Sequence, residues 1–184
     1  MNSVTEGERD SGQSGAKPRA EKESGSAFHL LFVCTGNTCR SPMALGLALR
    51  TLQNWRWKSV EVKSAGVAAI SGSEASPGAL RTAKRHGIDL TPHRSAQLSV
   101  DLVQWADLIL TMSEGHLVKV EALGGVLKVA LITQFIEDPE ESSEPSLEGV
   151  LDPIGGEDSI YEETFEQLRV LVERALERLN LARL

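Results

Sequence analysis

Residues 28–55 of the chain read FHLLFVCTGNTCRSPMALGLALRTLQNW, and this segment carries the clearest indication of the fold class. Its first part, Phe28 to Val33, is a short apolar run without polar alternation beyond His29, which is typical of a strand covered on both faces in a parallel sheet. From Pro42 to about Trp55 the apolar residues recur at helical spacing, with Ser41 available as N-cap and Pro42 at the first helical position. The stretch predicts a strand, a loop and a helix.

The remaining chain continues this alternation. Further short β-prone runs lie at Ser59–Lys63, Ala106–Met112 and Leu127–Thr133. Helical segments are expected at Pro77–His86 before Gly87, around Ser99–Trp105, around Ser113–Leu123, and from Ser159 to about Leu179. This order predicts an α/β fold, a doubly wound four-stranded parallel sheet flanked by helices, with its binding crevice at the carboxyl ends of the strands.

Length and charge restrict the class of protein. A chain of 184 residues with 41% hydrophobic residues favours one domain with a substantial core. The net charge is -7, so we expect no strongly positive surface and no nucleic-acid partner. Since no apolar run approaches the roughly 18 residues that span a bilayer, and no signal peptide is evident, we expect no membrane partner and a cytoplasmic protein.

Two polar segments stand apart from the alternation. Residues 1–27 are rich in Gly, Ser, Glu and Lys, which predicts a disordered arm ahead of one domain at residues 28–184. Glu137 to Glu148 holds six acidic residues, two prolines and no basic residue, and is expected to be a solvated loop.

The chemistry is concentrated in the loop after the first strand. Cys34 and Cys39 are the only two cysteines and lie within six residues, so they cannot brace distant parts of the fold, and no metal-ligand spacing accompanies them. Gly36 permits the tight backbone turns by which successive amides converge on an oxyanion, and the helix N-terminus adds its positive dipole end. Arg40 can grip two oxyanion oxygens.

The same positive field favours the thiolate form of Cys34, which makes this residue a candidate nucleophile. We therefore expect a phosphate-binding loop after the first strand. A structural alternative is that Cys34 and Cys39 are two buried thiols and Arg40 is a surface cation at a helix start.

The segment VCTGNTCRSPMA at residues 33–44 resembles the phosphate-binding loop of the low-molecular-weight protein tyrosine phosphatases. The likeness extends from about His29 to the C-terminus and includes Ser64-Ala65-Gly66, Lys84-Arg85-His86-Gly87-Ile88 and Ala106-Asp107-Leu108. The resemblance implies that Cys34 attacks phosphorus to form a phosphocysteine, which water then hydrolyses without a metal or other cofactor. Arg40 would stabilise the transition state, and the remaining loop residues would bind the substrate or shape the loop: Thr35, Gly36, Asn37, Thr38, Cys39 and Ser41.

The resemblance also implies roles for residues outside this loop. Asp152, in the segment LDPIGG, matches the family's general acid, which afterwards acts as base toward water. His86 matches a histidine that steadies the loop asparagine, although a histidine before a glycine is also typical of a helix end. Cys39 forms a reversible disulfide with Cys34 in similar enzymes, or is a buried bystander.

Thr38 bears on the choice of substrate. Phosphotyrosine-directed members of the family commonly carry Ile at its position and aromatic pocket walls, whereas the loop here is similar to that of bacterial protein-arginine phosphatases. The walls expected by analogy are not aromatic: Thr35, Thr38, Val67 to Ile70, and Ile154. A threonine hydroxyl and the Asp152 carboxylate can both accept N–H bonds from a guanidinium. Phosphorylated proteins, with phosphoarginine favoured over phosphotyrosine, are thus the expected partners, and free phosphate or other oxyanions should occupy the loop.

The sequence differs from the arginine phosphatases at one position of the expected pocket, and two functions other than a phosphatase are also considered. Ile154 stands where arginine phosphatases have Phe, which favours the phosphotyrosine alternative. Arsenate reductases of the same fold relay electrons through cysteines outside the loop, and this sequence has none there. A noncatalytic phosphoprotein-binding module would not need the combination of Cys34, Arg40 and Asp152.

Overall fold

The computed structural model describes residues 27–137 and 148–181 and contains one parallel sheet. Its strands are β1 (Phe28–Cys34), β2 (Val60–Gly66), β3 (Leu108–Thr111) and β4 (Val129–Leu131), in the spatial order β2-β1-β3-β4. β1 pairs along its whole length with β2, from Phe28 opposite Val60 to Cys34 opposite Gly66, and on its other edge with β3. The predicted doubly wound parallel sheet is confirmed.

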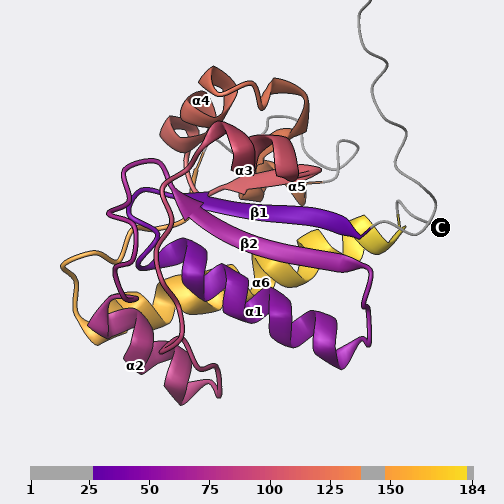
Figure 1. The fold of residues 1–184 in the computed structure, drawn as a ribbon. Helices are drawn as coiled ribbons and strands as arrows, with labels where there is room; N and C mark the ends of the chain where they lie inside the picture. The colour runs from indigo at the N-terminus through magenta and orange to yellow at the C-terminus, as the bar shows by residue number, and fades with distance from the viewer. Residues whose placement is uncertain (1–26, 138–147, 182–184) are drawn as a thin grey trace, which may run out of the picture.

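Helices cover both faces of the sheet (Figure 1). They are α1 (Arg40–Asn54), α2 (Pro77–Arg85), α3 (Val100–Trp105), α4 (Glu114–Ala122), α5 (Ile132–Phe135) and α6 (Asp158–Leu181). α1, α2 and α6 lie on one face, where α1 and α6 pack together, and α3 and α4 lie on the other (Figure 1). Because the strands are parallel, each connection from a strand to the next helix begins at a carboxyl end, and these loops lie together at one edge of the sheet.

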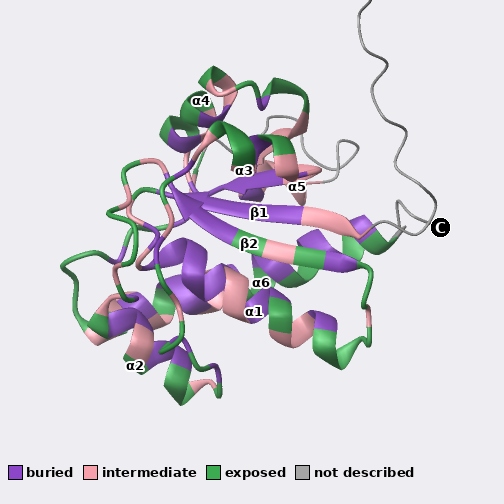
Figure 2. Cartoon of the chain, viewed as in Figure 1, coloured by how far each residue is buried: buried purple, intermediate pink, exposed green. Residues whose placement is uncertain are grey.

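The β1 sequence explains why it is central. Successive side chains of a strand point to opposite faces, so an unbroken apolar run serves two cores. Leu30 and Phe32 face the α1–α6 side, while Leu31 and Val33 face the α3–α4 side, and all four are fully buried. The buried colouring along β1 in Figure 2 begins at its middle and continues to the carboxyl end. The loop that follows therefore starts from a rigid position.

Element boundaries depart from the sequence-based expectations at several places. Helix α1 begins at Arg40, with Cys39 as its N-cap, so the predicted N-cap role of Ser41 is wrong: Ser41 lies inside the first turn and its hydroxyl contacts Cys34 instead. The predicted strand Leu127–Thr133 is reduced to β4, because a 3₁₀ turn at Val126–Lys128 precedes it and α5 follows at once. Neither short helix was predicted.

Two expectations lie outside the described residues. The arm expected at residues 1–27 falls there except for Ala27, and the acidic stretch falls there between residues 138 and 147. Among the helices of the described part, none combines the length and apolar character needed to cross a membrane.

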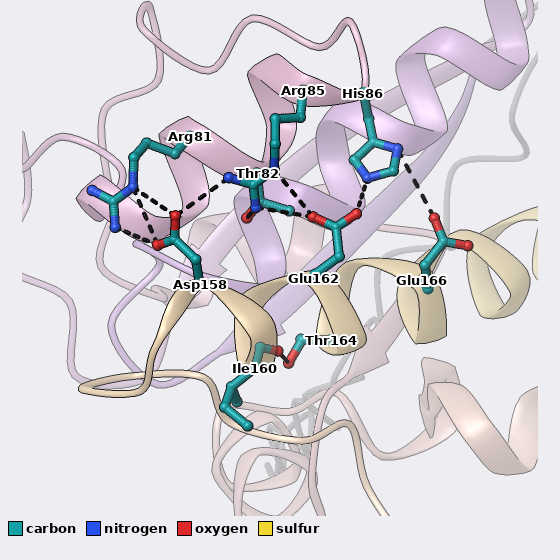
Figure 3. A network of polar contacts seen from close by, with 9 residues as sticks. All are labelled: Arg81, Thr82, Arg85, His86, Asp158, Ile160, Glu162, Thr164 and Glu166. Carbon is teal, nitrogen blue, oxygen red and sulfur yellow. Dashed lines mark hydrogen bonds and ion pairs between the residues drawn. The ribbon is translucent and has the colours of Figure 1, made fainter.

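Ion pairs fasten α2 to α6 (Figure 3). Basic side chains from the end of α2 face acidic side chains along the first turns of α6. The pairs are Arg81 and Arg85 with Asp158, Arg85 with Glu162, and His86 with Glu162 and Glu166. The imidazole of His86 also stacks on buried Phe165, with ring centroids 4.3 Å apart. These contacts join the first turns of α6 to α2.

Candidate active site

The segment between β1 and α1 forms a loop whose backbone carbonyls are held from outside. Four carbonyls accept hydrogen bonds from donors elsewhere in the chain: Cys34 from the Val67 amide (2.9 Å), Thr35 from the Ala68 amide (2.9 Å), Asn37 from His93 Nε2 (2.8 Å) and Thr38 from the Ser76 amide (2.8 Å). Within a trans peptide unit the C=O and the following N–H point in opposite directions. The amides of Gly36, Thr38 and Cys39 therefore point toward the interior of the loop.

These inward amides are available to a ligand. In the part of the chain that the structure describes, no protein acceptor takes the N–H groups of Gly36, Thr38 or Cys39. Buried backbone donors are nearly always paired, so a ring of unpaired amides at a helix N-terminus is typical of an oxyanion site. The amide donors that a phosphate-binding loop needs are thus present among the described residues, and phosphate binding stays a prediction.

Gly66, the last residue of β2, makes the tight loop possible. A Cβ atom there would stand 2.5 Å from the Thr35 carbonyl oxygen and 2.8 Å from the Asn37 nitrogen. Only a glycine lets the end of β2 approach the loop backbone this closely. Gly66 belongs to the segment Ser64-Ala65-Gly66 that carries part of the family resemblance, and in this chain the segment contacts the loop backbone directly.

Asn37 is the internal brace of the loop. It is fully buried with φ of 55°, a left-handed conformation that asparagine tolerates better than most residues. Its Nδ2 donates to Ser41 Oγ (2.7 Å) and Ser64 Oγ (2.9 Å), while its Oδ1 accepts from the Ala96 amide (2.9 Å). These three hydrogen bonds are contacts that the loop-shaping role expected for Asn37 requires.

Cys34 lies at the base of the loop beside Ser41. The Cys34 Sγ and Ser41 Oγ atoms are 3.0 Å apart. Ser41 Oγ accepts from Asn37, and its own proton has two acceptors within reach, the Ala65 carbonyl at 3.4 Å and the nearer sulfur. When it points at the sulfur, it would stabilise a thiolate. Cys34 is almost fully buried, with 2% of its surface exposed, so a reagent reaches it only through the loop.

Arg40 reaches across the mouth of the loop from the first turn of α1. Its Nη1 donates to the Val150 carbonyl (3.2 Å), and its Nη2 donates to Thr35 Oγ1 (3.3 Å) and to Asp152 Oδ2. Its Nε is buried and has no hydrogen-bond partner among the described residues. An unpaired guanidinium N–H costs free energy unless a ligand accepts from it, so the Arg40 Nε marks a place for an oxyanion oxygen.

A small cavity of about 170 Å³ joins these groups. Its lining residues are Cys34, Thr35, Gly36, Thr38, Cys39, Arg40, Asp152 and Ile154. The structure thus brings the predicted nucleophile, guanidinium and acid together. Asn37 and Ser41 lie behind the loop rather than on the cavity wall, and the expected wall Val67 to Ile70 does not line it.

Asp152 stands at the open side of this cavity. Its Oδ1 accepts from the Ile154 amide (3.2 Å), which is a local turn contact, and its side chain is 41% exposed. A half-exposed carboxylate next to the cavity can exchange protons with water and with a bound leaving group.

Cys39 lines the same cavity and contacts Ser76 and Tyr161. Both cysteines are free thiols, and Cys39 Sγ lies 3.2 Å from Ser76 Oγ and 3.6 Å from the Tyr161 hydroxyl. The reversible disulfide with Cys34 stays a prediction.

The supporting role that the resemblance implied for His86 is wrong. His86 caps the end of α2 and pairs with Glu162 of α6, whereas His93 contacts the Asn37 carbonyl. Burial lowers the pKa of His93, so its ring is neutral near pH 7 and donates from Nε2. His86, Glu162 and Glu166 are spaced closely enough to ligate a metal, but Arg85 already pairs with Glu162, and a second cation there would be repelled.

A second histidine at the site had no sequence signal. His116 of α4 is 5% exposed, and its Nε2 lies 2.9 Å from Thr35 Oγ1. His116 lies on α4, which covers the face of the sheet opposite to α1, and it is 81 positions from Thr35 in the sequence. Only the fold brings the two residues together.

Comparisons with known proteins agree with this geometry. Residues 29–183 match the family model described as low molecular weight phosphotyrosine protein phosphatase. A protein-arginine-phosphatase of Geobacillus stearothermophilus is 38% identical over 155 residues, which cover 83% of this chain and 97% of that protein. A probable low molecular weight protein-tyrosine-phosphatase of Ralstonia solanacearum is 39% identical over 128 residues, 66% of this chain and 85% of that protein.

A solved structure adds a mechanistic point. It is an arginine phosphatase in which a cysteine is replaced by an active-site serine that is phosphorylated. It is 32% identical, with a TM-score of 0.75, and the match covers 83% of this chain and 96% of that one. A phosphorylated nucleophile position in that protein is consistent with a covalent phosphoenzyme.

Proposed function

The chain belongs to the low molecular weight phosphotyrosine protein phosphatase family, and from this premise we propose that it hydrolyses phosphorylated protein side chains through a phosphocysteine, with phosphoarginine preferred. The observation that carries the proposal is the single cavity shared by Cys34, Arg40 and Asp152 beside a ring of inward amides. A phosphoryl group fits this set because its oxygens would accept from the amides and from Arg40 Nε.

The first chemical step forms the covalent intermediate. The Cys34 sulfur attacks phosphorus in line with the leaving atom, so that an S–P bond forms as the bond from phosphorus to the substrate nitrogen or oxygen breaks. Asp152, released from Arg40 by the incoming oxyanion, takes up a proton from solvent at its exposed side and gives this proton to that leaving atom.

The second step restores the enzyme. The Asp152 carboxylate takes a proton from water, whose oxygen attacks phosphorus as the S–P bond breaks, and inorganic phosphate is the product. The Ser41 hydroxyl donates a hydrogen bond to the departing thiolate and stabilises its charge. Arg40 and the amides stabilise the charge on the equatorial oxygens in both steps.

Thr38 supports the preference for phosphoarginine. Its hydroxyl makes only a 3.7 Å contact with Cys39 Sγ, so its lone pairs remain available at the cavity wall. A phosphorylated guanidinium offers N–H donors to Thr38 and Asp152, whereas the aryl phosphate ester of phosphotyrosine offers none. No aromatic side chain lines the cavity among the described residues, and a phenol ring therefore has no stacking partner in it.

Phosphotyrosine is the second candidate substrate because of Ile154. This side chain lies at the cavity rim with 63% of its surface exposed. An exposed aliphatic side chain provides an apolar surface for a phenol ring, although without aromatic stacking.

A paired assay tests the preference. The specificity constant kcat/KM is measured on phosphoarginine and phosphotyrosine peptides of one sequence, for the natural protein, Thr38→Ile and Thr38→Ser. We expect the natural protein and Thr38→Ser to favour phosphoarginine, and Thr38→Ile to lose most of that preference. Faster phosphotyrosine hydrolysis by the natural protein would refute the preference but not the phosphatase activity.

A further inference from the structure

A chain of hydrogen bonds connects the buried side of α4 with the guanidinium at the active site. Ser113 Oγ lies 2.9 Å from His116 Nδ1, and His116 Nε2 lies 2.9 Å from Thr35 Oγ1. Thr35 Oγ1 also accepts from Arg40 Nη2 at 3.3 Å. Both ring nitrogens of His116 are thus engaged. Among the described residues, Thr35 from the loop and Asp152 from the segment before α6 are the side chains that accept from Arg40 Nη2.

The N-terminus of α4 has no side-chain capping hydrogen bond. Ser113 is the N-cap residue of α4, yet its side chain makes no capping hydrogen bond. A serine cap stabilises a helix by about 1 kcal/mol. Here the hydroxyl contacts the imidazole instead, which fixes the ring orientation of His116.

The protonation state of His116 is set by its surroundings. Burial, and secondarily the positive charge of Arg40, lowers the pKa of His116 to about 4, while Asp152 acts in the opposite direction. The ring is therefore neutral near pH 7, with one nitrogen donating and the other accepting. A neutral ring beside Arg40 adds no repulsion and can hold the Thr35 hydroxyl in either hydrogen-bond direction.

The contact with Thr35 gains importance during catalysis. Three protein groups accept from the terminal nitrogens of Arg40: the Val150 carbonyl, Thr35 and Asp152. When Asp152 turns to the leaving atom, only the first two remain to orient the guanidinium. Thr35 is itself an exposed residue at the cavity mouth, and without His116 its hydroxyl would keep only the longer contact with Arg40 to orient it.

We propose that His116 is a positioning residue of the phosphatase reaction: it orients the Thr35 hydroxyl and, through it, the Arg40 guanidinium that holds the transferring phosphoryl group. The inference rests on the proposed function, and it adds a residue from the opposite helical layer to the site. The geometry of α4, and not only that of the loop, then determines how the oxyanion is held.

A matched pair of amides provides the test. A glutamine side chain can place its terminal amide near the position of Nε2, within reach of Thr35, whereas the shorter asparagine reaches only as far as Nδ1. We expect His116→Gln to retain most of kcat, and His116→Asn and His116→Leu to lose about 10- to 100-fold, the scale of a displaced catalytic group. KM should change less than kcat, because the contact matters most after Asp152 leaves Arg40.

A double-mutant cycle with Thr35→Val separates positioning from a general loss of packing. If His116 acts through Thr35, the variant Thr35→Val with His116→Asn should be no slower than Thr35→Val alone. Additive losses, or equal activity of the Gln and Asn variants, would overturn the inference.

The proposed function can fail separately. If the natural protein hydrolyses neither phosphopeptide, the phosphatase proposal falls, and the same cycle is then measured as the affinity for vanadate. Coupling between Thr35 and His116 in vanadate binding supports the positioning role, and its absence rejects it.

Discussion

The guanidinium of Arg40 and the carboxylate of Asp152 are paired across the cavity above Cys34. Arg40 is nearly buried at the start of α1, whereas Asp152 lies on the partly exposed segment before α6. Both groups act on the phosphoryl group in the proposed reaction, one on its oxygens and the other on the leaving atom. A bound oxyanion competes with the carboxylate for Arg40, so binding itself would free the acid for proton transfer.

Replacing Asp152 with Asn should separate binding from turnover. The substitution keeps the size of the side chain but removes the carboxylate and its transferable proton. We expect kcat on a phosphopeptide to fall about 10²- to 10⁴-fold, the usual contribution of a general acid and base. Vanadate should bind more tightly, because no negative charge then competes for Arg40.

Calorimetric titration with vanadate, alongside steady-state kinetics, measures both quantities. Asp158→Asn in the α2–α6 ion pairs is the control for a lost carboxylate and should change neither. Weaker vanadate binding by Asp152→Asn would contradict the competition between the carboxylate and the oxyanion.

Ser41→Ala should slow the steps in which the Cys34 thiolate takes part. The variant removes the hydroxyl 3.0 Å from Cys34 Sγ and leaves the Asn37 amide without one of its two acceptors. We expect about a 10- to 100-fold loss of kcat, since one hydrogen bond to a charged group contributes about 1.5 to 3 kcal/mol. Rapid-quench kinetics should show that breakdown of the phosphoenzyme slows more than its formation. Equal slowing of both steps would exclude a specific role toward the departing thiolate.

Gly66→Ala should distort the loop without touching any catalytic side chain. The added Cβ would meet the backbone of Thr35 and Asn37 at 2.5 and 2.8 Å, so the loop or β2 must shift. We expect about 1 to 3 kcal/mol loss in the free energy of unfolding, typical of overpacking, together with weaker phosphate binding. Gly115→Ala in α4 is the matched control, because its Cβ would meet nothing closer than 3.9 Å. Urea unfolding and phosphate titration check both variants.

Local patterns of the sequence were sufficient for the sheet and the centre of the site. The apolar run Phe28–Val33 predicted the central strand because a strand buried on both faces needs no alternation. The segment from Cys34 to Arg40 predicted the oxyanion loop because its residue types and the helix that follows are all local. Asp152 was found through family resemblance alone, since an Asp-Pro pair is otherwise an ordinary turn signal.

Contacts between distant segments were beyond sequence reasoning. His93 and His116 reach the loop across 56 and 81 positions, and neither stands in a pattern of spacing that indicates a site. The N-cap of α1 was misplaced at Ser41 because its hydroxyl contacts the sulfur, an interaction that overrides the local capping preference. Tertiary contacts therefore decided the points that local propensity left open.

The exchange of roles between two histidines can be tested directly. His93→Ala removes the hydrogen-bond donor to the carbonyl of Asn37, the loop residue with positive φ. We expect kcat to fall about 10-fold, because one buried acceptor is left unpaired. His86→Ala removes a helix-end ion pair and the stacking on Phe165, so it should lower the free energy of unfolding and leave kcat unchanged. The opposite assignment of the two effects would restore the role first expected for His86.

The depressed pKa of His116 predicts how stability depends on pH. The folded protein titrates this ring near pH 4, whereas an unfolded chain titrates histidine near about 6.5. Between these values the unfolded state binds a proton that the folded state does not, so the free energy of unfolding rises with pH. The contribution is complete above about pH 6.5 and is lost as the pH falls toward 4. It amounts to at most about 3 to 4 kcal/mol, because the pKa falls from 6.5 to about 4 and one pKa unit corresponds to about 1.4 kcal/mol.

Urea unfolding of the natural protein and of His116→Gln between pH 4 and 8 measures this contribution. Carboxylates with lowered pKa values, such as Asp158 and Glu162, also affect acid stability, but they are present in both proteins and cancel in the difference. The difference in unfolding free energy should change only between about pH 4 and 6.5 and be level above that range. Parallel curves over the whole range would mean that His116 has the same pKa in the folded and the unfolded protein. The ring would then become charged beside Arg40 below about pH 6.5 instead of staying neutral there, as the positioning role requires.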